Sequence, residues 1–518
     1  MLDILIKNGI VIDGTGAVPK NLDVAIQKGR IVEVAAKISG NALQTIDAKG
    51  SFVSPGFIDI QNHSDSYWTL FNQPEQASLL AQGITTIIVG NCGASLAPLL
   101  SQESIKGIQK WHSLQGINLN WTSVAEFLQL LSQVSLGVNV GTLIGHSTLR
   151  RGLIGDEIRH LSGEEIKVLD KILATGLAEG ALGLSMGLIY AHEVNASGNE
   201  LEILSRNLLK DQKYLSIHLR SEASHILESL NEVIDLSKQT GVAVKISHLK
   251  LRGKKNWPLF DQVLDKLEQA YHQGVKISFD VYPYDTSWSV LYTYLPKWAY
   301  EGGRDNILSA IASLTNRRKI LDYLRQQGHD FGSILVAEAS GNQNFVGKTI
   351  RQIAENLNVT KEEAMLNIIA ATKAQVVVFD HNLSPDQVEK LLASPLSMIA
   401  TDGSGYSKRM SELIHPRCFG TMPRFLSLIR EKKILKWEQA IKKITSEPAK
   451  LLGLPDRGRI VPKLAGDIVI FDPQTIAGHT DYTNPDILPE GVEFVLINGK
   501  IALDHDRIMN LAGQVIKR

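Results

Sequence analysis

Five residues whose side chains could do chemistry stand at or just after the ends of short apolar runs. They are His63, Cys92, His218, His248 and Asp402, and the runs are FIDI, ITTIIVGN, LSI, VKIS and LSMIAT. Imidazole and thiolate are good ligands for first-row metals, and a mixed nitrogen and sulfur set suits Zn2+ best. An aspartate beside such a metal could carry protons in a hydrolytic reaction. The residue types therefore indicate a zinc site with an acid–base group next to it.

The elements that must position these residues alternate between two kinds. Strand-like runs such as VAVKISHLK are separated by stretches such as EEIKVLDKILATGLAEG, where apolar residues recur at the three- and four-residue spacing of amphipathic helices. Continued over roughly 400 residues, this pattern predicts a parallel (β/α)8 barrel of the TIM type. A doubly wound open sheet is the competitor, but no GxGxxG follows the first strand. In a barrel the carboxyl ends of the strands converge, so the five residues should form one constellation.

Both ends of the chain have a different sequence pattern, in which short runs of alternating apolar and polar residues, typical of strands, are separated by turn residues. Residues 1–54 and 450–518 are predicted to form one small β-sandwich domain, because the two ends of a chain often lie close together. Residues 55–449 would then form the barrel. An aromatic and helical stretch at about 286–341 is predicted to be an inserted subdomain or lid.

Each candidate residue has an ordinary structural explanation when it is considered alone. A single cysteine such as Cys92 is usually a small buried apolar residue, and Asp402, which precedes Gly403 and Ser404, could cap a helix. Their joint placement at the same end of successive strands favours a functional site.

The charge balance excludes several classes of partner. Lys plus Arg and Asp plus Glu both number 54, which gives no overall field to hold nucleic acid or anionic lipid. No apolar run approaches the roughly 18 residues that a membrane span needs. The two cysteines are too few for a disulfide scaffold, and we expect them to be thiols in the cytoplasm. The sequence leaves the oligomeric state open.

Several motifs resemble those of one known family. They are VSPGFIDIQNHSD, VGNCGASLAP, SIHLRSE, KISHLKLRG, SFDVYPY, TDGS and HPRCFGTMPRFL. Together they resemble the N-acyl-D-amino-acid deacylases, or D-aminoacylases, of the amidohydrolase superfamily. The terminal segments ILIKNGIVIDGTG and AGDIVIFDP resemble the small β-domain of that superfamily, so the similarity runs essentially from end to end.

The resemblance implies zinc-dependent hydrolysis of the amide bond of N-acyl-D-amino acids, and the D-configuration enters only through it. It assigns the tightly held zinc to Cys92, His218 and His248, and the catalytic acid–base role to Asp402. It also implies that a further group of residues holds the carboxylate of the small-molecule substrate. That group is Tyr190, Lys250, Arg417 and a serine after YPY, which would be Ser289 or Ser287 with a shift, because Trp288 stands at the unshifted position.

One departure from the family pattern concerns the first barrel strand. The family has His-x-His there, whereas this chain has Gln61-Asn62-His63. An amide oxygen is a poor zinc ligand beside an imidazole, so we expect one zinc ion, with His63 as the remaining histidine of the motif. Asp65 could be an oxygen ligand or a capping residue. His146 could contact an oxyanion or be a buried structural histidine.

Two other functions stay open at this point. The first is a cyclic-amide hydrolase of the dihydroorotase or hydantoinase type, although Cys92 stands where such enzymes use a bridging lysine. The second is a catalytically weakened binding protein, which the glutamine at position 61 keeps open.

Overall fold

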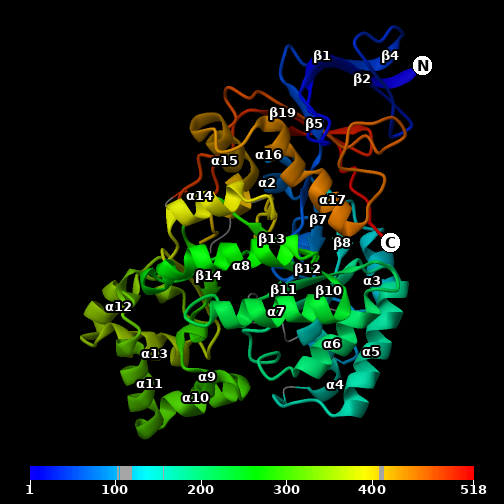
Figure 1. The fold of residues 1–518 in the computed structure, drawn as a ribbon. Helices are drawn as coiled ribbons and strands as arrows, with labels where there is room; N and C mark the ends of the chain where they lie inside the picture. Colours follow the sequence, from blue (N-terminus) through cyan, green and yellow to red (C-terminus); the bar gives the residue numbers. More distant parts are fainter. Residues whose placement is uncertain (102–103, 106–118, 156, 408–412, 483) are drawn as a thin grey trace.

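The computed structural model describes residues 1–101, 104–105, 119–155, 157–407, 413–482 and 484–518. A barrel of parallel strands lies at its centre (Figure 1). In chain order its strands are β6 (Phe57–Asp59), β7 (Ile84–Val89), β8 (Asn139–Thr142) continued by β9 (Ile144–Gly145), β10 (Gly183–Gly187), β11 (Tyr214–His218), β12 (Ala243–Ile246), β13 (Ile277–Val281) and β17 (Ser397–Ile399). These make eight strand positions among the described residues, and neighbours in sequence pair in space.

The barrel closes between its first and last strands. Asn62 and Gly403 form a parallel bridge, and the backbone N–H of His63 donates to the Gly403 carbonyl at 2.7 Å. The strands β10 and β11 are buried at every position, which is typical of parallel strands covered on both sides. The predicted (β/α)8 barrel is confirmed.

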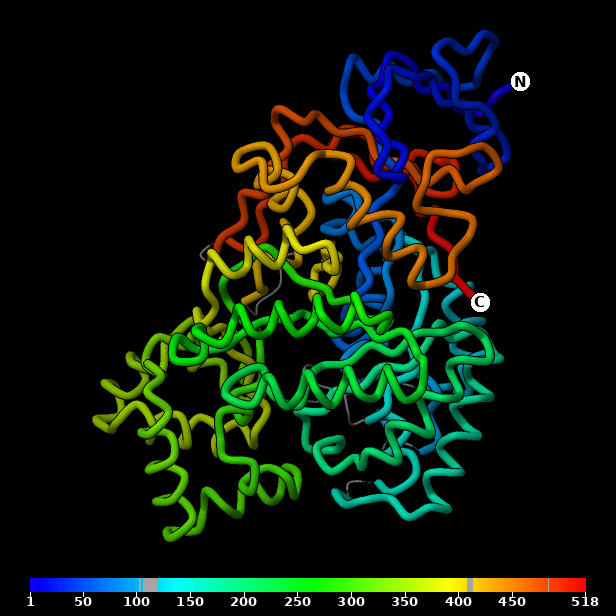
Figure 2. The backbone as a smooth tube through the Cα atoms, viewed as in Figure 1, coloured from blue at the N-terminus to red at the C-terminus, as the bar shows by residue number. Residues whose placement is uncertain are grey.

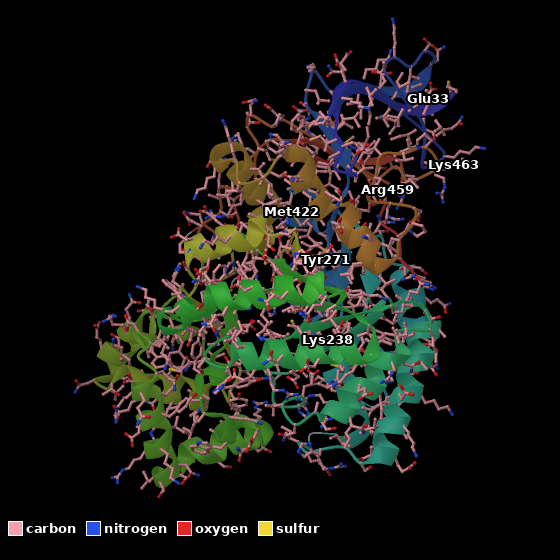
Figure 3. All side chains as sticks on the ribbon, in the orientation of Figure 1. Glu33, Lys238, Tyr271, Met422, Arg459 and Lys463 are labelled. Atoms are coloured by element: carbon pink, nitrogen blue, oxygen red, sulfur yellow. The ribbon has the colours of Figure 1, made fainter. Side chains whose placement is uncertain are left out.

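Helices surround the strands. The main ones are α3 (Val124–Leu131), α4 (His146–Ile154), α5 (Gly163–Ala178), α6 (Gly198–Asn207), α7 (Ile226–Thr240), α8 (Phe260–His272), α14 (Pro385–Ala393), α15 (Arg417–Lys432) and α16 (Trp437–Ile444). Helix α5 begins with a capping box between Ser162 and Glu165, and α7 ends where Gly241 adopts a φ of 78°. The exposed residues Lys238 and Tyr271 belong to the outer faces of α7 and α8 (Figure 3).

Strands from both chain ends form a single nine-stranded sheet. The strands are β1 (Leu2–Val11), β2 (Lys20–Gln27), β3 (Arg30–Ala35), β4 (Ala42–Asp47), β5 (Phe52–Pro55), β18 (Ile468–Phe471), β19 (Val492–Ile497), β20 (Lys500–Asp504) and β21 (Arg507–Ile508). The two halves join where β18 pairs with β5 in antiparallel register, which brings the N-terminal and C-terminal segments together (Figure 2). The β-domain predicted from both ends is present.

A separate layer of structure lies between β13 and β17. Strands β14 (Ser287–Val290), β16 (Val376–Asp380) and β15 (Leu335–Ala339) form a small antiparallel sheet. The helices with it are α9 (Lys297–Tyr300), α10 (Gly303–Ala312), α11 (Leu314–Gln326), α12 (Ile350–Leu357) and α13 (Lys361–Ala371). Much of this layer packs in a second hydrophobic cluster, which also takes in Cys92 and Tyr190. Helices α12 and α13 and strand β16 of this layer lie after residue 341, where the predicted insertion ends. The predicted domain boundaries, including the insertion at about 286–341, stay predictions.

Among the described residues, none of the helices is both long and apolar enough to cross a bilayer.

Candidate active site

A small chamber is lined by the residues that the family resemblance assigns as metal ligands, catalytic aspartate and substrate contacts. These are His63, Cys92, Tyr190, His218, His248, Lys250, Ser289, Asp402 and Arg417. The chamber has a volume of about 20 Å³ and is also lined by Tyr67, Glu222, Arg252 and Trp288. The structure therefore brings residues from distant parts of the chain together, while their individual roles stay predictions.

The thiol of Cys92 lies at the centre of the candidate ligands. Its Sγ is 3.5 Å from Nε2 of His248, and the rings of His218 and His248 are 4.4 Å apart. One possible donor atom from each of the three residues lies within 4.8 Å of the other two. Burial by itself would raise the pKa of the Cys92 thiol, but His248, His218 and His63 bring it well below its usual value. A lowered pKa favours the thiolate, the form that binds metals.

These three donors fit a zinc ion. With bonds of about 2.3 Å to sulfur and about 2.0 Å to nitrogen, tetrahedral zinc would separate a sulfur and a nitrogen ligand by about 3.5 Å. The observed distance between Cys92 Sγ and His248 Nε2 is 3.5 Å. Neither ring nitrogen of the buried His218 has a hydrogen-bond partner of ordinary geometry. An imidazole left in this state inside a protein is ready to bind a cation.

The backbone at the site is unusual. Cys92, His248 and Asp402 adopt φ angles of 52°, 37° and 48°, a left-handed region that residues other than glycine rarely occupy. Each lies in the loop directly after a barrel strand. Such strain persists where surrounding structure imposes it, and it is common where side chains must be aimed at a ligand.

Asp402 lies between a histidine and an arginine. Its Oδ1 is 3.1 Å from Nε2 of His63, and its Oδ2 is 2.8 Å from Nη1 of Arg417. Burial would raise the pKa of this carboxyl, but the positive charges of Arg417, His248 and His63 hold it well below its usual value. A carboxyl whose pKa is lowered in this way is ionised at neutral pH.

The two serines that follow the YPY motif have different surroundings. Ser289 lies in β14 and lines the chamber, whereas the hydroxyl of Ser287 donates to the carbonyl of Asp380 at 3.4 Å. Trp288, between them, lies close to the guanidinium of Arg417, whose Cζ is 5.0 Å from the centre of a Trp288 ring. Of the two serines, Ser289 is therefore the one placed to contact a molecule in the chamber.

Glu222 is a site residue that the sequence reasoning missed. One of its carboxylate oxygens lies 3.1 Å from Nδ1 of His248, 3.5 Å from Nε2 of His218 and 2.6 Å from Nζ of Lys250. Nζ of Lys250 also lies 2.7 Å from the same Nδ1. With a metal on Nε2 of His248 the proton would be on Nδ1, and Glu222 is the neighbour that could accept it, because an ammonium has no acceptor. The position of Glu222 four residues after His218 in SIHLRSE was the available signal.

We expect Glu222→Gln to weaken zinc binding by about 10- to 100-fold, because the orienting charge on the metal-binding histidine is lost. Competition with a chromophoric chelator would measure the change. Glu228→Gln is the matched control, since Glu228 is an exposed residue of α7. Equal zinc affinity in both variants would contradict the orienting role.

Two residues with open assignments lie outside the chamber. His146 is fully buried, and its two ring nitrogens contact carboxylates of Glu193 at 2.9 Å and Glu200 at 2.7 Å. It is therefore a structural histidine, and the oxyanion contact is wrong. The carboxylate of Asp65 accepts the backbone N–H groups of Ser66 and Gly90, which is the capping alternative.

Comparison with known proteins places this architecture in a family. The family model described as "Amidohydrolase family" matches residues 44–320 and 406–503. The chain belongs to the amidohydrolase family. The matched segments of this amidohydrolase include the candidate metal ligands and Arg417, while Asp402 lies just outside them.

Several deacylases are similar to this amidohydrolase over nearly their whole length. It is 27% identical to N-acyl-D-glutamate deacylase of Alcaligenes xylosoxydans xylosoxydans, over 100% of this chain and 97% of the relative. A solved N-acyl-D-glutamate deacylase from Bordetella bronchiseptica, complexed with zinc and a phosphonate mimic of the tetrahedral intermediate, has a TM-score of 0.84 and 27% identity. A solved D-aminoacylase, described for one-metal activation and second-metal attenuation at its binuclear metal center, has a TM-score of 0.85 and 27% identity. Both structural matches cover all of both chains.

Proposed function

We propose that this amidohydrolase uses zinc to hydrolyse the amide bond of N-acyl-D-amino acids, releasing a carboxylate and a free D-amino acid. The observation that carries the proposal is the chamber itself, in which a zinc-binding set, an ionised aspartate and two cations converge. The relatives that are deacylases of D-amino acids support the substrate class and its configuration.

The hydrolytic step needs a nucleophile and a proton carrier. Zinc held by Cys92, His218 and His248 would supply a water nucleophile at neutral pH and polarise the amide carbonyl. Asp402 accepts the proton of the attacking water and then delivers it to the leaving nitrogen, since an amide nitrogen leaves poorly unless it is protonated. Its contact with Arg417 fixes the carboxylate in place for both transfers.

The cations of the chamber suit the α-carboxylate of the substrate. Arg417 packs over the rings of Tyr282 and Trp288, at 4.7 and 5.0 Å, so its guanidinium is held as a rigid two-pronged donor. Lys250 adds an ammonium on the side of Glu222. Tyr190 and Ser289 are proposed to complete this binding site with their hydroxyls.

Substrate groups beyond the amide have room in a neighbouring cavity. This cavity has a volume of about 910 Å³ and shares Glu222 and Arg252 with the chamber. The chamber, at about 20 Å³, has room for about one water molecule, so most of a substrate would lie in the neighbouring cavity. Trp288 and Ser289 of β14 form part of the chamber wall.

We expect Lys250→Met to lower kcat/KM for an N-acetyl-D-amino acid by about 10- to 100-fold, because a hydrogen bond to a charged group contributes about 1.5–3 kcal/mol. The same substrate with its carboxylate converted to a carboxamide should lose less. Lys238→Met, on the exposed face of α7, is the control. Equal losses on both substrates would argue against carboxylate binding by Lys250.

Zinc analysis combined with an amino-acid release assay tests the proposed function. About one zinc per chain and hydrolysis of N-acetyl-D- but not N-acetyl-L-amino acids is the expected result. Zinc without release from any N-acyl amino acid would contradict the proposed substrate. We propose neither open alternative: Cys92 stands where cyclic-amide hydrolases use a bridging lysine, and donor atoms of Cys92, His218 and His248 lie together as a metal site requires. A thiolate ligand also suits a reducing compartment, so we propose that the enzyme works in the cytoplasm.

A further inference from the structure

Gln61, which replaces a family histidine, is part of a buried polar network. Its Nε2 lies 3.1 Å from the Cys92 sulfur, and its Oε1 lies 2.5 Å from Nζ of Lys245 and 3.2 Å from Oγ of Ser247. The lysine also contacts Asp280 Oδ2 at 2.6 Å, and both of these side chains are fully buried. The other oxygen of Asp280 accepts the backbone N–H of His248 at 2.8 Å.

Chemistry decides which way the Gln61 amide points. Side-chain amide oxygen and nitrogen atoms are interchangeable in shape, so their assignment depends on their partners. An ammonium has donors and no acceptor, so the atom of Gln61 that faces Lys245 must be the oxygen. The NH2 group then faces Cys92 and donates to its sulfur at 3.1 Å. Asp280 holds the lysine in place, so the amide cannot turn its oxygen toward a metal.

This arrangement bears on a second group of donors in the same chamber. Donor atoms of His63, Cys92 and Asp402 also lie within 4.8 Å of one another. A second ion bound there would share the Cys92 sulfur with the first. The hydrogen bond from Gln61 already occupies that sulfur, and the nearby ammonium of Lys245 adds unfavourable charge.

We propose that Gln61, fixed by Lys245 and Asp280, restricts this amidohydrolase to a single metal ion by occupying the Cys92 sulfur that a second ion would have to share. The inference rests on the proposed zinc-dependent function, and it assigns Lys245 and Asp280 as positioning residues. The metal count per chain tests it without any substrate.

The experiment loads chelator-stripped protein with excess Zn2+ or Co2+, removes unbound metal and counts the bound ions. Wild type should retain one ion. Q61H should also retain one ion. The unprotonated ring nitrogen of the introduced imidazole would accept a hydrogen bond from the Lys245 ammonium and would then not be available to bind a metal. Q61H/K245M should retain two, and its cobalt form should lose EPR intensity as two ions couple through the shared sulfur. K443M, which removes a different buried lysine, is the control and should retain one.

Two ions in wild type or in Q61H would overturn the proposal, and so would a single ion in folded Q61H/K245M. If the unpaired Asp280 prevents that variant from folding, Q61H/K245M/D280N removes the buried charge and carries the same expectation. Should neither fold, the counts for wild type and Q61H decide. One ion without hydrolysis of N-acyl-D-amino acids would refute the proposed function alone, and hydrolysis with two ions would refute this inference alone.

Discussion

Asp402→Asn should lower kcat by about 100- to 10,000-fold, the range expected when a general acid–base group is removed. The asparagine keeps the size of the side chain but cannot accept a proton from water. Zinc should stay bound at about one ion per chain, because Cys92, His218 and His248 are unchanged. The measurement pairs steady-state kinetics on an N-acetyl-D-amino acid with zinc analysis of the same sample.

Asp235→Asn is the control for this substitution. Asp235 is an exposed aspartate of α7, so its variant should keep both full activity and full zinc content. Undiminished turnover by Asp402→Asn with zinc bound would show that another group moves the proton. A simultaneous loss of zinc would instead indicate that Asp402 is a metal ligand. Zinc is measured for this reason, because donor atoms of Asp402, His63 and Cys92 lie close together.

Cys92→Ala should weaken zinc binding by more than about 100-fold, a loss larger than that expected from any orienting partner. The thiolate is the one anionic donor in the set with His218 and His248, and alanine supplies no replacement. Activity at low zinc should fall in parallel and should recover in part when zinc is added in excess. Chelator competition measures the affinity, and the kinetics are followed across a zinc titration.

The chain offers a matched control in its other cysteine. Cys418 is also fully buried, but it packs with Tyr406, Ile414 and Phe419, and burial raises the pKa of its thiol to about 12. It is therefore a neutral thiol in an apolar setting. Cys418→Ala should keep its zinc affinity and show only a small loss of thermal stability. Equal zinc loss in the two variants would mean that Cys92 acts through folding and not through ligation.

The sequence by itself determined the barrel and the set of residues that meet at its end. Alternating strand and helix patterns are local properties, and they are sufficient to predict parallel strands wound into a barrel. Once the barrel is predicted, residues at the carboxyl ends of its strands are expected to lie at the same end of the barrel. This is why Cys92, His218, His248 and Asp402 could be grouped although 310 residues separate the first from the last.

Only the tertiary structure decided which neighbours each of these side chains has. Ser289 rather than Ser287 lines the chamber, His146 is enclosed by two carboxylates, and Glu222 lies beside His248. The largest difference between the sequence-based expectation and the structure concerns Gln61. From the sequence alone, this glutamine indicates only that a histidine ligand is missing. In the structure it is a fixed donor to Cys92, because Lys245 and Asp280, contributed by β12 and β13, orient its amide. Pairings of this kind depend on distances between residues far apart in the chain, and neither residue type nor spacing encodes those distances.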